Sequence, residues 1–181
     1  MSVVDILLEF EGIIGAILGS VATLVVTDIL QRKGKIKQYL MFYEAKTETY
    51  KDVGCGQKGK SDNDIYGYSI KYNFQIYNGY NFPKIMRKFS LDFYKDKVLV
   101  MSIVPKDEST RYFSCATSRA DDMEISNISS HEIASYDHTV YIGNWEEEFK
   151  KLNGINKIEL AYYDEKDKKQ IIVLTKNEIV M

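Results

Sequence analysis

The chain has 181 residues and a net formal charge of -2, and 45% of its residues are hydrophobic and 13% aromatic, which is enough for about one domain of ordinary size. Two Pro, 11 Gly and 28% charged residues exclude a low-complexity or collagen-like chain and are untypical of disorder. Two Cys exclude a disulfide-dense scaffold and a four-thiolate zinc or iron–sulfur site built from this chain alone.

The first predicted element is an apolar helix over residues 12–30. Residues 12–27 read GIIGAILGSVATLVVT without a charge, and apart from Asp28 the apolar character continues to Leu30. At about 1.5 Å per residue this helix measures roughly 28 Å, close to the thickness of a hydrocarbon core. The length predicts a single transmembrane helix. The alternatives are a cleaved signal peptide, which the acidic N-terminus disfavours, and a buried helix of a soluble domain.

Charge is distributed unequally along residues 1–37. Residues 1–30 carry four acids and no base, whereas the short segment after them carries four bases. The bases are Arg32, Lys33, Lys35 and Lys37. Because Lys and Arg beside a membrane end favour the cytoplasmic side, we expect the N-terminus outside and residues 38–181 in the cytoplasm. The bases are expected to lie against anionic lipid of the bilayer, and the net charge of -2 on the remaining domain argues against nucleic acid as a partner.

Small residues occupy one face of the predicted helix. They are Gly12, Gly15, Ala16, Gly19 and Thr23. Gly15 and Gly19 form a GxxxG spacing, and in lipid such a face lets two backbones approach closely. The pattern favours a homo-oligomer or pairing with another membrane helix, and the alternative is that glycine is simply common in membrane helices.

Beyond the basic segment the sequence changes to the alternation of apolar and polar residues that is typical of antiparallel strands. Strands are expected at residues 36–50, 66–77, 85–94, 98–104, 111–115, 139–142, 157–163 and 170–174. Residues 78–81, NGYN, are expected to form a hairpin turn. One short helix is expected at residues 145–152, with Asn144 as its cap and Asn153 and Gly154 at its end. The spacing predicts a mainly β domain, an antiparallel β-sandwich with a small barrel as the alternative.

Three segments of this domain carry a resemblance to known proteins. They read YNFQIYNGYNFPKIMRKFSLDFYKDKVL, ISSHEIASYDHTVYI and INKIELAYYDEKDKKQIIVL. They resemble the cytoplasmic part of small bacterial and phage proteins that join one N-terminal membrane helix to an immunoglobulin-like β-sandwich. The shared features are a strand, an Asn, a turn, a Pro and a strand, here with Asn78 and Pro83, and a late strand that ends in an acidic turn, here residues 164–167. The resemblance implies the architecture, but no functional residue, because the function of that group is mostly unknown.

Residues 54–61, GCGQKGKS, match the phosphate-loop pattern GxxxxGK[ST]. That loop works between a buried strand and a helix whose N-terminus faces the phosphates. Here the preceding residues, KTETYKDV, are polar, and the following residues, SDNDIYGYSIKY, contain β-formers where a helix is required. We therefore interpret residues 52–64 as a solvated loop.

Residues 131–138, HEIASYDH, are the densest group of possible metal ligands, but Ser135 breaks the HExxH spacing of zinc proteases. We interpret this segment as a polar turn, with a metal or acid–base role as the alternative. Neither Cys55 nor Cys115 has a neighbouring base that would mark a nucleophile. No catalytic residue, metal ligand or cofactor is therefore predicted.

The leading hypothesis is a non-enzymatic, membrane-tethered interaction module whose partners are the bilayer and an unidentified protein. The second is a ligand-sensing membrane effector, in which the β domain senses a small molecule and clusters the membrane helices, as in some bacterial antiviral systems. A roomy barrel interior would favour the second hypothesis and a filled sandwich core would oppose it. An enzyme is the third.

Overall fold

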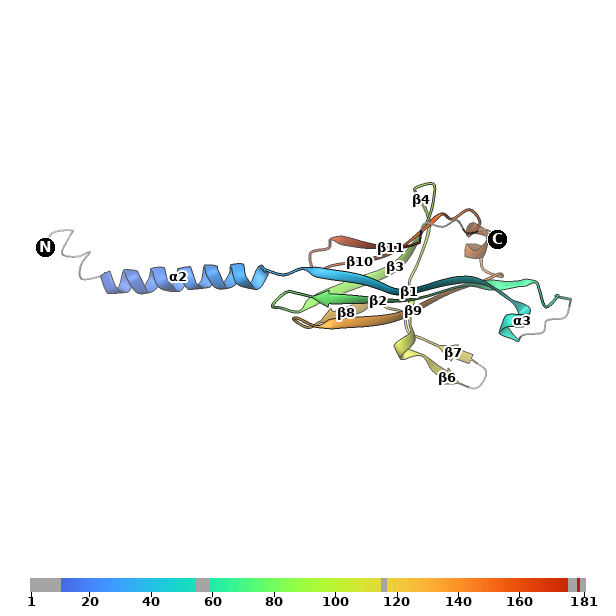
Figure 1. The fold of residues 1–181 in the computed structure, drawn as a ribbon, viewed down its shortest axis with the longest axis horizontal. Helices are drawn as coiled ribbons and strands as arrows, with labels where there is room; N and C mark the ends of the chain where they lie inside the picture. The colour runs from blue at the N-terminus through green and yellow to red at the C-terminus, as the bar shows by residue number, and fades with distance from the viewer. Residues whose placement is uncertain (1–10, 55–58, 115–116, 176–178, 180–181) are drawn as a thin grey trace.

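One long helix leads into a β domain (Figure 1). The computed structural model describes residues 11–54, 59–114, 117–175 and 179, without the side chains of residues 11, 12, 14, 31 and 32. The elements are α2 (Glu11–Arg32), β1 (Ile36–Thr49), α3 (Tyr50–Val53), β2 (Ile65–Asn78), β3 (Lys84–Lys95), β4 (Val98–Ile103), β5 (Lys106–Asp107), the 3-10 turn η1 (Glu108–Thr110), β6 (Tyr112–Ser114), β7 (Thr117–Arg119), β8 (Ile125–Ile128), β9 (Ile133–Gly143), α4 (Glu147–Lys151), β10 (Lys157–Tyr163) and β11 (Lys169–Thr175).

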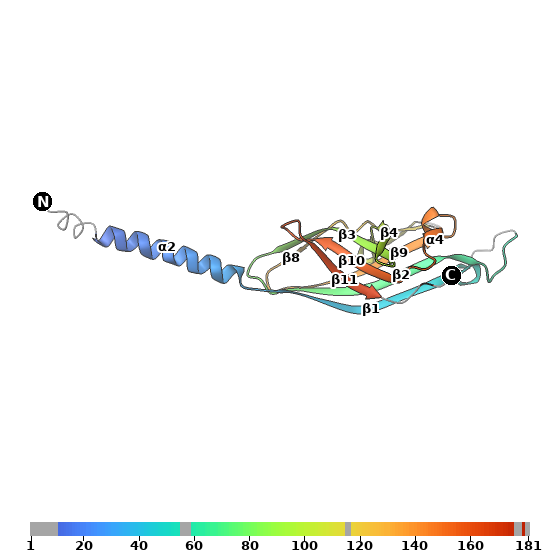
Figure 2. The same cartoon turned by 90° about the horizontal axis from the view of Figure 1, so that it is seen from above.

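α2 projects from one end of the β domain as an isolated rod (Figures 1 and 2). A helix is thus present where the apolar segment predicted one, and its nine described large aliphatic side chains, from Ile13 to Leu30, are 50% to 70% exposed. Over the part of the chain that the structure describes, no helix reaches the combined length and hydropathy of a membrane span. A span over residues 12–30 therefore stays a prediction.

Two antiparallel sheets form the β domain and lie as two layers (Figure 2). The first sheet has the strand order β1-β2-β9-β5, and the second has the order β11-β10-β3-β4, with β8 paired to the first part of β3. β6 and β7 form a separate two-stranded hairpin, the arm, which stands out from the first sheet (Figure 1). The mainly β, antiparallel architecture that the alternation predicted is confirmed.

The core lies between the two sheets. Alternate residues of β2, among them Ile70, Tyr72 and Phe74, are fully buried because successive side chains of a strand point to opposite faces. They pack in one hydrophobic cluster with residues of β3 and β10 such as Leu91 and Leu160. The interior is filled by these side chains, so the domain is a sandwich and not a small barrel.

The hairpin expected at residues 78–81 is absent. β2 and β3 belong to different sheets, so this connection carries the chain from one layer of the sandwich to the other. Asn78 and Gly79 are typical of a chain reversal. The same residue types occur both in a turn within one sheet and in a connection that crosses between two sheets.

The prediction of a polar turn at residues 131–138 is also wrong. β9 begins at Ile133, and its 11 residues pair continuously with β2, from Ile133 opposite Tyr77 to Gly143 opposite Gly67. The long partner strand supplies a complete ladder of hydrogen bonds, and this tertiary pairing overrides the low strand propensity of the polar residues.

The short helices differ from the expectation as well. α4 begins after Glu146 and not at Trp145, because the side chain of Asn144 donates from Nδ2 to the carbonyl oxygen of Ile65 at 2.6 Å and does not cap the helix. α3 was not expected, and its single turn is held by a capping box between Thr49 and Asp52.

Candidate functional site

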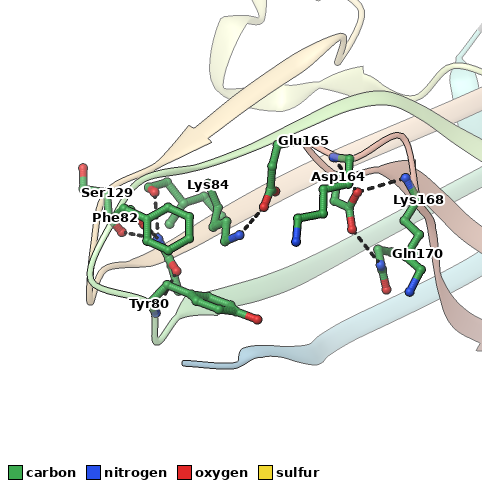
Figure 3. Close-up of polar contacts among 11 residues, drawn as sticks. Tyr80, Phe82, Lys84, Ser129, Asp164, Glu165, Lys168 and Gln170 are labelled. Atoms are coloured by element: carbon green, nitrogen blue, oxygen red, sulfur yellow. Dashed lines mark hydrogen bonds and ion pairs between the residues drawn. The ribbon is translucent and has the colours of Figure 1, made fainter. Parts of the chain in front are cut away.

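The candidate site is the end of the sandwich from which α2 projects. Three connections meet at this end: residues 79–83 between β2 and β3, residues 129–132 between β8 and β9, and residues 164–168 between β10 and β11 (Figure 1). Figure 3 shows how side chains from these connections face one another. We call this surface the helix-proximal end.

The end of α2 is attached to the connection between β2 and β3. The side chain of Asn81 donates from Nδ2 to the carbonyl oxygen of Leu30 at 3.1 Å, and the N–H of Gly79 donates to the carbonyl oxygen of Lys35 at 3.0 Å. A Cβ atom at Gly34 would lie 2.6 Å from the carbonyl oxygen of Gly79, so only glycine permits this approach. The end of α2 and the three-residue linker that follows it are therefore joined to the sandwich by specific contacts.

Asn78 organises the helix-proximal end from inside. Its side chain is fully buried, and its Nδ2 lies 2.9 Å from the carbonyl oxygen of Phe82, 3.0 Å from that of Ser129 and 3.1 Å from that of Ile128. Its Oδ1 accepts a hydrogen bond of 3.0 Å from the N–H of Tyr80. One amide thus joins two of the three connections.

Lys84 links the third connection to the first. Its side chain is almost completely buried, and its ammonium group forms an ion pair with Glu165 (Figure 3). The same Nζ lies 4.2 Å from the ring centre of Tyr80 and 4.4 Å from that of Phe82. A carboxylate and two aromatic faces are the usual surroundings that stabilise a partly desolvated cation.

Asp164 shapes the turn that carries Glu165. Its Oδ1 accepts hydrogen bonds of 2.9 Å from the backbone N–H groups of Lys166 and Lys168, and its Oδ2 accepts one of 3.1 Å from Gln170. Burial by itself raises the pKa of Asp164, but the hydrogen bonds from Lys168, Lys166 and Gln170 together hold this pKa below its ordinary value. The turn is therefore ordered by an ionised carboxylate.

A cavity of about 400 Å³ lies between these groups and the start of β1. It is lined by Ile36, Gln38, Tyr80, Lys84, Ile85, Met86, Tyr162, Asp164, Glu165, Lys166, Lys168 and Gln170. Gln38 donates to the hydroxyl of Tyr162, whose pKa burial raises to about 12. The lining is polar and mixed in charge, and it includes Ile36, the first residue of β1.

The structure places three of the four predicted membrane-surface bases beside this end. Lys33, Lys35 and Lys37 are exposed, and the side chain of Arg32 is not among those that the structure describes. Lys166 and Lys168, which the sequence did not mark, are exposed on the turn between β10 and β11. The helix-proximal end therefore gathers basic residues from two distant segments of the chain.

The predicted packing face of α2 makes no contact with the rest of the described chain. Gly12 lies in the first turn, Ala16 and Thr23 are exposed, and a Cβ atom at Gly15 or Gly19 would meet nothing within 4 Å. The hydroxyl of Thr23 donates to the carbonyl oxygen of Gly19 at 2.8 Å, so its polarity is satisfied within the helix.

The other sequence motifs are not assembled into a site. His131 lies in a turn with its Nε2 2.7 Å from Asn81 Oδ1, whereas His138 is buried in β9 with its Nδ1 3.0 Å from the hydroxyl of Tyr72. Among the described residues no three His, Cys, Asp or Glu side chains are grouped to hold a metal.

The described residues around the apparent phosphate loop also lack the strand and helix that such a loop needs. Gly54 ends α3 with φ +66°, and Ser61 donates from its N–H to Asp64 at 2.9 Å directly before β2 begins at Ile65. Residues 55–58, which include Cys55, and Cys115 lie outside the described residues.

Lys84 and Glu165 are the pair that sequence reasoning missed, and 81 positions separate them. Asn78 and Pro83 marked a turn, but nothing in the local pattern indicates which distant turn faces it. Only an explicit pairing of β3 with β10 brings the two residues together.

The comparisons with known proteins identify one family. The sequence model of the YopI Ig-like domain matches residues 34–175. The SPbeta prophage-derived uncharacterized protein YopI of Bacillus subtilis (strain 168) is 37% identical over 106 residues, which cover 59% of this chain. The chain spans 60% of the length of that relative. The resemblance to bacterial and phage proteins with an immunoglobulin-like sandwich is thereby confirmed.

Two solved structures are similar only at a low level. The Iho670 flagellar-like filament has a TM-score of 0.40 at 10% identity, with 98% of this chain and 100% of that chain covered. An X-ray structure of a Northeast Structural Genomics Consortium target has a TM-score of 0.32 at 10% identity, with 81% and 86% covered. At these TM-scores neither structure bears on function.

Proposed function

This chain belongs to the YopI Ig-like domain family, and from that premise we propose that it is a non-enzymatic, membrane-tethered interaction module. In this proposal α2 lies in the bilayer and the helix-proximal end lies at the membrane surface. The opposite end and the edges of the sandwich are then presented to an unidentified protein partner.

The exposure of α2 carries the proposal. Its nine described large aliphatic side chains are at least half exposed, and the remaining face carries small residues. A helix without a charged face is stable only when it is surrounded by apolar material. Burying a Val, Leu or Ile is worth about 1.5 to 3 kcal/mol, so covering the helix is worth on the order of 10 kcal/mol. Lipid covers every side at once, whereas a single partner covers one.

Basic residues at the base of α2 support the same placement. Lys33, Lys35 and Lys37 follow the helix, and Lys166 and Lys168 add two exposed bases on a turn that also carries Asp164, Glu165 and Asp167. Each Lys near an anionic leaflet contributes about 1 kcal/mol of attraction. Since such bases favour the cytoplasmic leaflet, we place the sandwich in the cytoplasm and the N-terminus outside.

The open glycine face supports self-association of the tethered chains. Gly15 and Gly19 have no neighbouring atoms that would prevent another helix from approaching. Dispersion contacts between two backbones are strong only at short distance, so a second copy or a partner membrane helix gains most on this face.

Membrane association of the full chain tests the proposal. We expect the protein to float with liposomes that contain anionic phospholipid and to resist carbonate extraction. A double variant, Val21→Lys with Leu24→Lys, should lose both properties because each Lys at a helix centre costs about 2.5 to 3.5 kcal/mol of insertion free energy.

The matched control is Val98→Lys with Leu99→Lys, which changes the same residue types at exposed positions of β4. This control should behave as the wild type. Soluble wild-type protein, or equal fractionation of the two double variants, would contradict membrane tethering.

The second hypothesis is a ligand-sensing effector. The filled core opposes the version of it in which the ligand binds in the interior of the β domain. The space between the sheets is filled by side chains such as Phe74, Phe89 and Leu91. Any ligand of this domain must bind outside the core.

A further inference from the structure

A cavity of about 1030 Å³ lies between the outer face of the first sheet and the arm. Its floor includes Lys71 of β2 and Thr139 and Tyr141 of β9, which alternate along their strands with core residues. Its wall includes Arg111 and Tyr112, at the base and in the first strand of the arm. The volume lies at the upper end of the range for small-molecule sites, about 300 to 1,000 Å³.

The charges that line this cavity cancel. Four bases and four acids face it: Lys71, Lys106, Arg111, Arg119, Glu48, Glu108, Asp121 and Asp137. Several are already engaged, because Arg111 forms an ion pair with Glu108, Lys106 lies 2.6 Å from Asp122, and Asp137 accepts from Asn73 at 2.7 Å. An anion would meet the carboxylates and a cation would meet the bases, so the lining selects neither sign.

Neutral hydroxyl groups also line the cavity. They belong to Ser69, Ser118, Thr139 and Tyr141. Ser118 is exposed, and its hydroxyl accepts a hydrogen bond of 3.0 Å from Arg111, so it can still donate to a ligand.

Aromatic side chains border the same cavity. Tyr112 on the arm and Phe42 on β1 are both about half exposed. Their flat apolar faces suit a ligand that has a flat apolar face of its own. An entirely apolar ligand is excluded, because it would leave the polar floor without hydrogen bonds.

From this combination we propose that the cavity binds a neutral oligosaccharide. Each sugar hydroxyl both donates and accepts, so it pairs with carboxylates, guanidinium groups and phenols in one balanced lining. The C–H face of a sugar ring packs on an aromatic side chain. The site lies on the outer face of the first sheet and is independent of the proposed membrane tethering.

Titration of the full chain with uncharged tetrasaccharides tests the proposal. The probes are maltotetraose, cellotetraose and chitotetraose, with the protein kept in a detergent that has no sugar headgroup. Isothermal calorimetry measures binding, and the single Trp gives a second readout because the Trp145 ring centre lies 6.3 Å from that of Tyr141. We expect saturable binding of at least one probe.

Tyr112→Ala should weaken this binding at least tenfold, and Phe113→Ala is its matched control. Phe113 is the neighbouring aromatic on β6, is 80% exposed and does not line the cavity. Ser118→Ala, which removes only the hydroxyl of an exposed lining residue, should weaken binding several-fold. Unchanged melting temperatures would show that the variants fold.

Three results would overturn the proposal. One is the absence of binding for all three tetrasaccharides at millimolar concentration. Another is equal affinity of Tyr112→Ala and the wild type. The third is binding of ATP or of a charged peptide, but of no neutral sugar.

Discussion

Replacement of Asn78 by Ala should destabilise the sandwich by roughly 3 to 5 kcal/mol. The buried amide lies within hydrogen-bond distance of the carbonyl oxygens of Phe82, Ser129 and Ile128, and it accepts from the N–H of Tyr80. A buried polar group that loses its partner costs about 1 to 3 kcal/mol, and Ala satisfies none of these groups. Water that enters the space left by the amide can form hydrogen bonds with some of these groups. The total loss of unfolding free energy is therefore smaller than the sum of the separate penalties.

Urea unfolding, followed by circular dichroism of the full chain, measures this loss. Because small domains have free energies of unfolding of about 5 to 15 kcal/mol, the midpoint should fall by a large fraction of its value. The matched control is Asn127→Ala at an exposed position of β8, which should change the free energy of unfolding by less than about 0.5 kcal/mol. A loss below 1 kcal/mol for Asn78→Ala would refute the assignment of this amide as the organiser of the helix-proximal end.

Three further outcomes are expected. A reporter fused after Met181 should be active only in the cytoplasm, and activity outside the cell membrane would reverse the orientation. Gly19→Ile should abolish self-association of the full chain in a membrane assay whereas Leu18→Ile should not, and equal signals would show that the glycine face is not a contact. Because burial lowers the folded-state pKa of His138 to about 4, the unfolded chain binds the proton more readily. The resulting loss of unfolding free energy is absent above about pH 6.5 and reaches roughly 3 kcal/mol near pH 4. Urea titrations should show this slope between pH 6.5 and 4.5 in the wild type and not in His138→Gln.

Much of the strand content follows from local alternation. β10 occupies the expected residues 157–163, β3 is one residue longer than expected at each end, and β4 is one residue shorter. In these strands apolar residues face the core at every second position, as at Leu91 and Phe93, so the period is visible in the sequence.

The parts that were not predicted depend on distant partners. The polar first half of β9 is a strand because β2 lies beside it, and Asn78 marks a crossing between sheets because Ile128 and Ser129 offer carbonyl groups to its amide. At the candidate site the bases Lys33, Lys35 and Lys37 are visible as a run, whereas the ion pair between Lys84 and Glu165 requires the strand order.

The strand order also determines which strands can pair early while the chain is being synthesised. β1 pairs with β2 and β3 pairs with β4, the next strands along the chain. The second partners, β9 for β2 and β10 for β3, are synthesised much later. At about 5 to 20 residues per second, the interval between the emergence of β1 and that of β10 is on the order of 10 s. If α2 enters the bilayer as proposed, the nascent chain holds an incomplete β1–β2 pair beside the membrane during that interval, and the sandwich closes only after the chain is anchored.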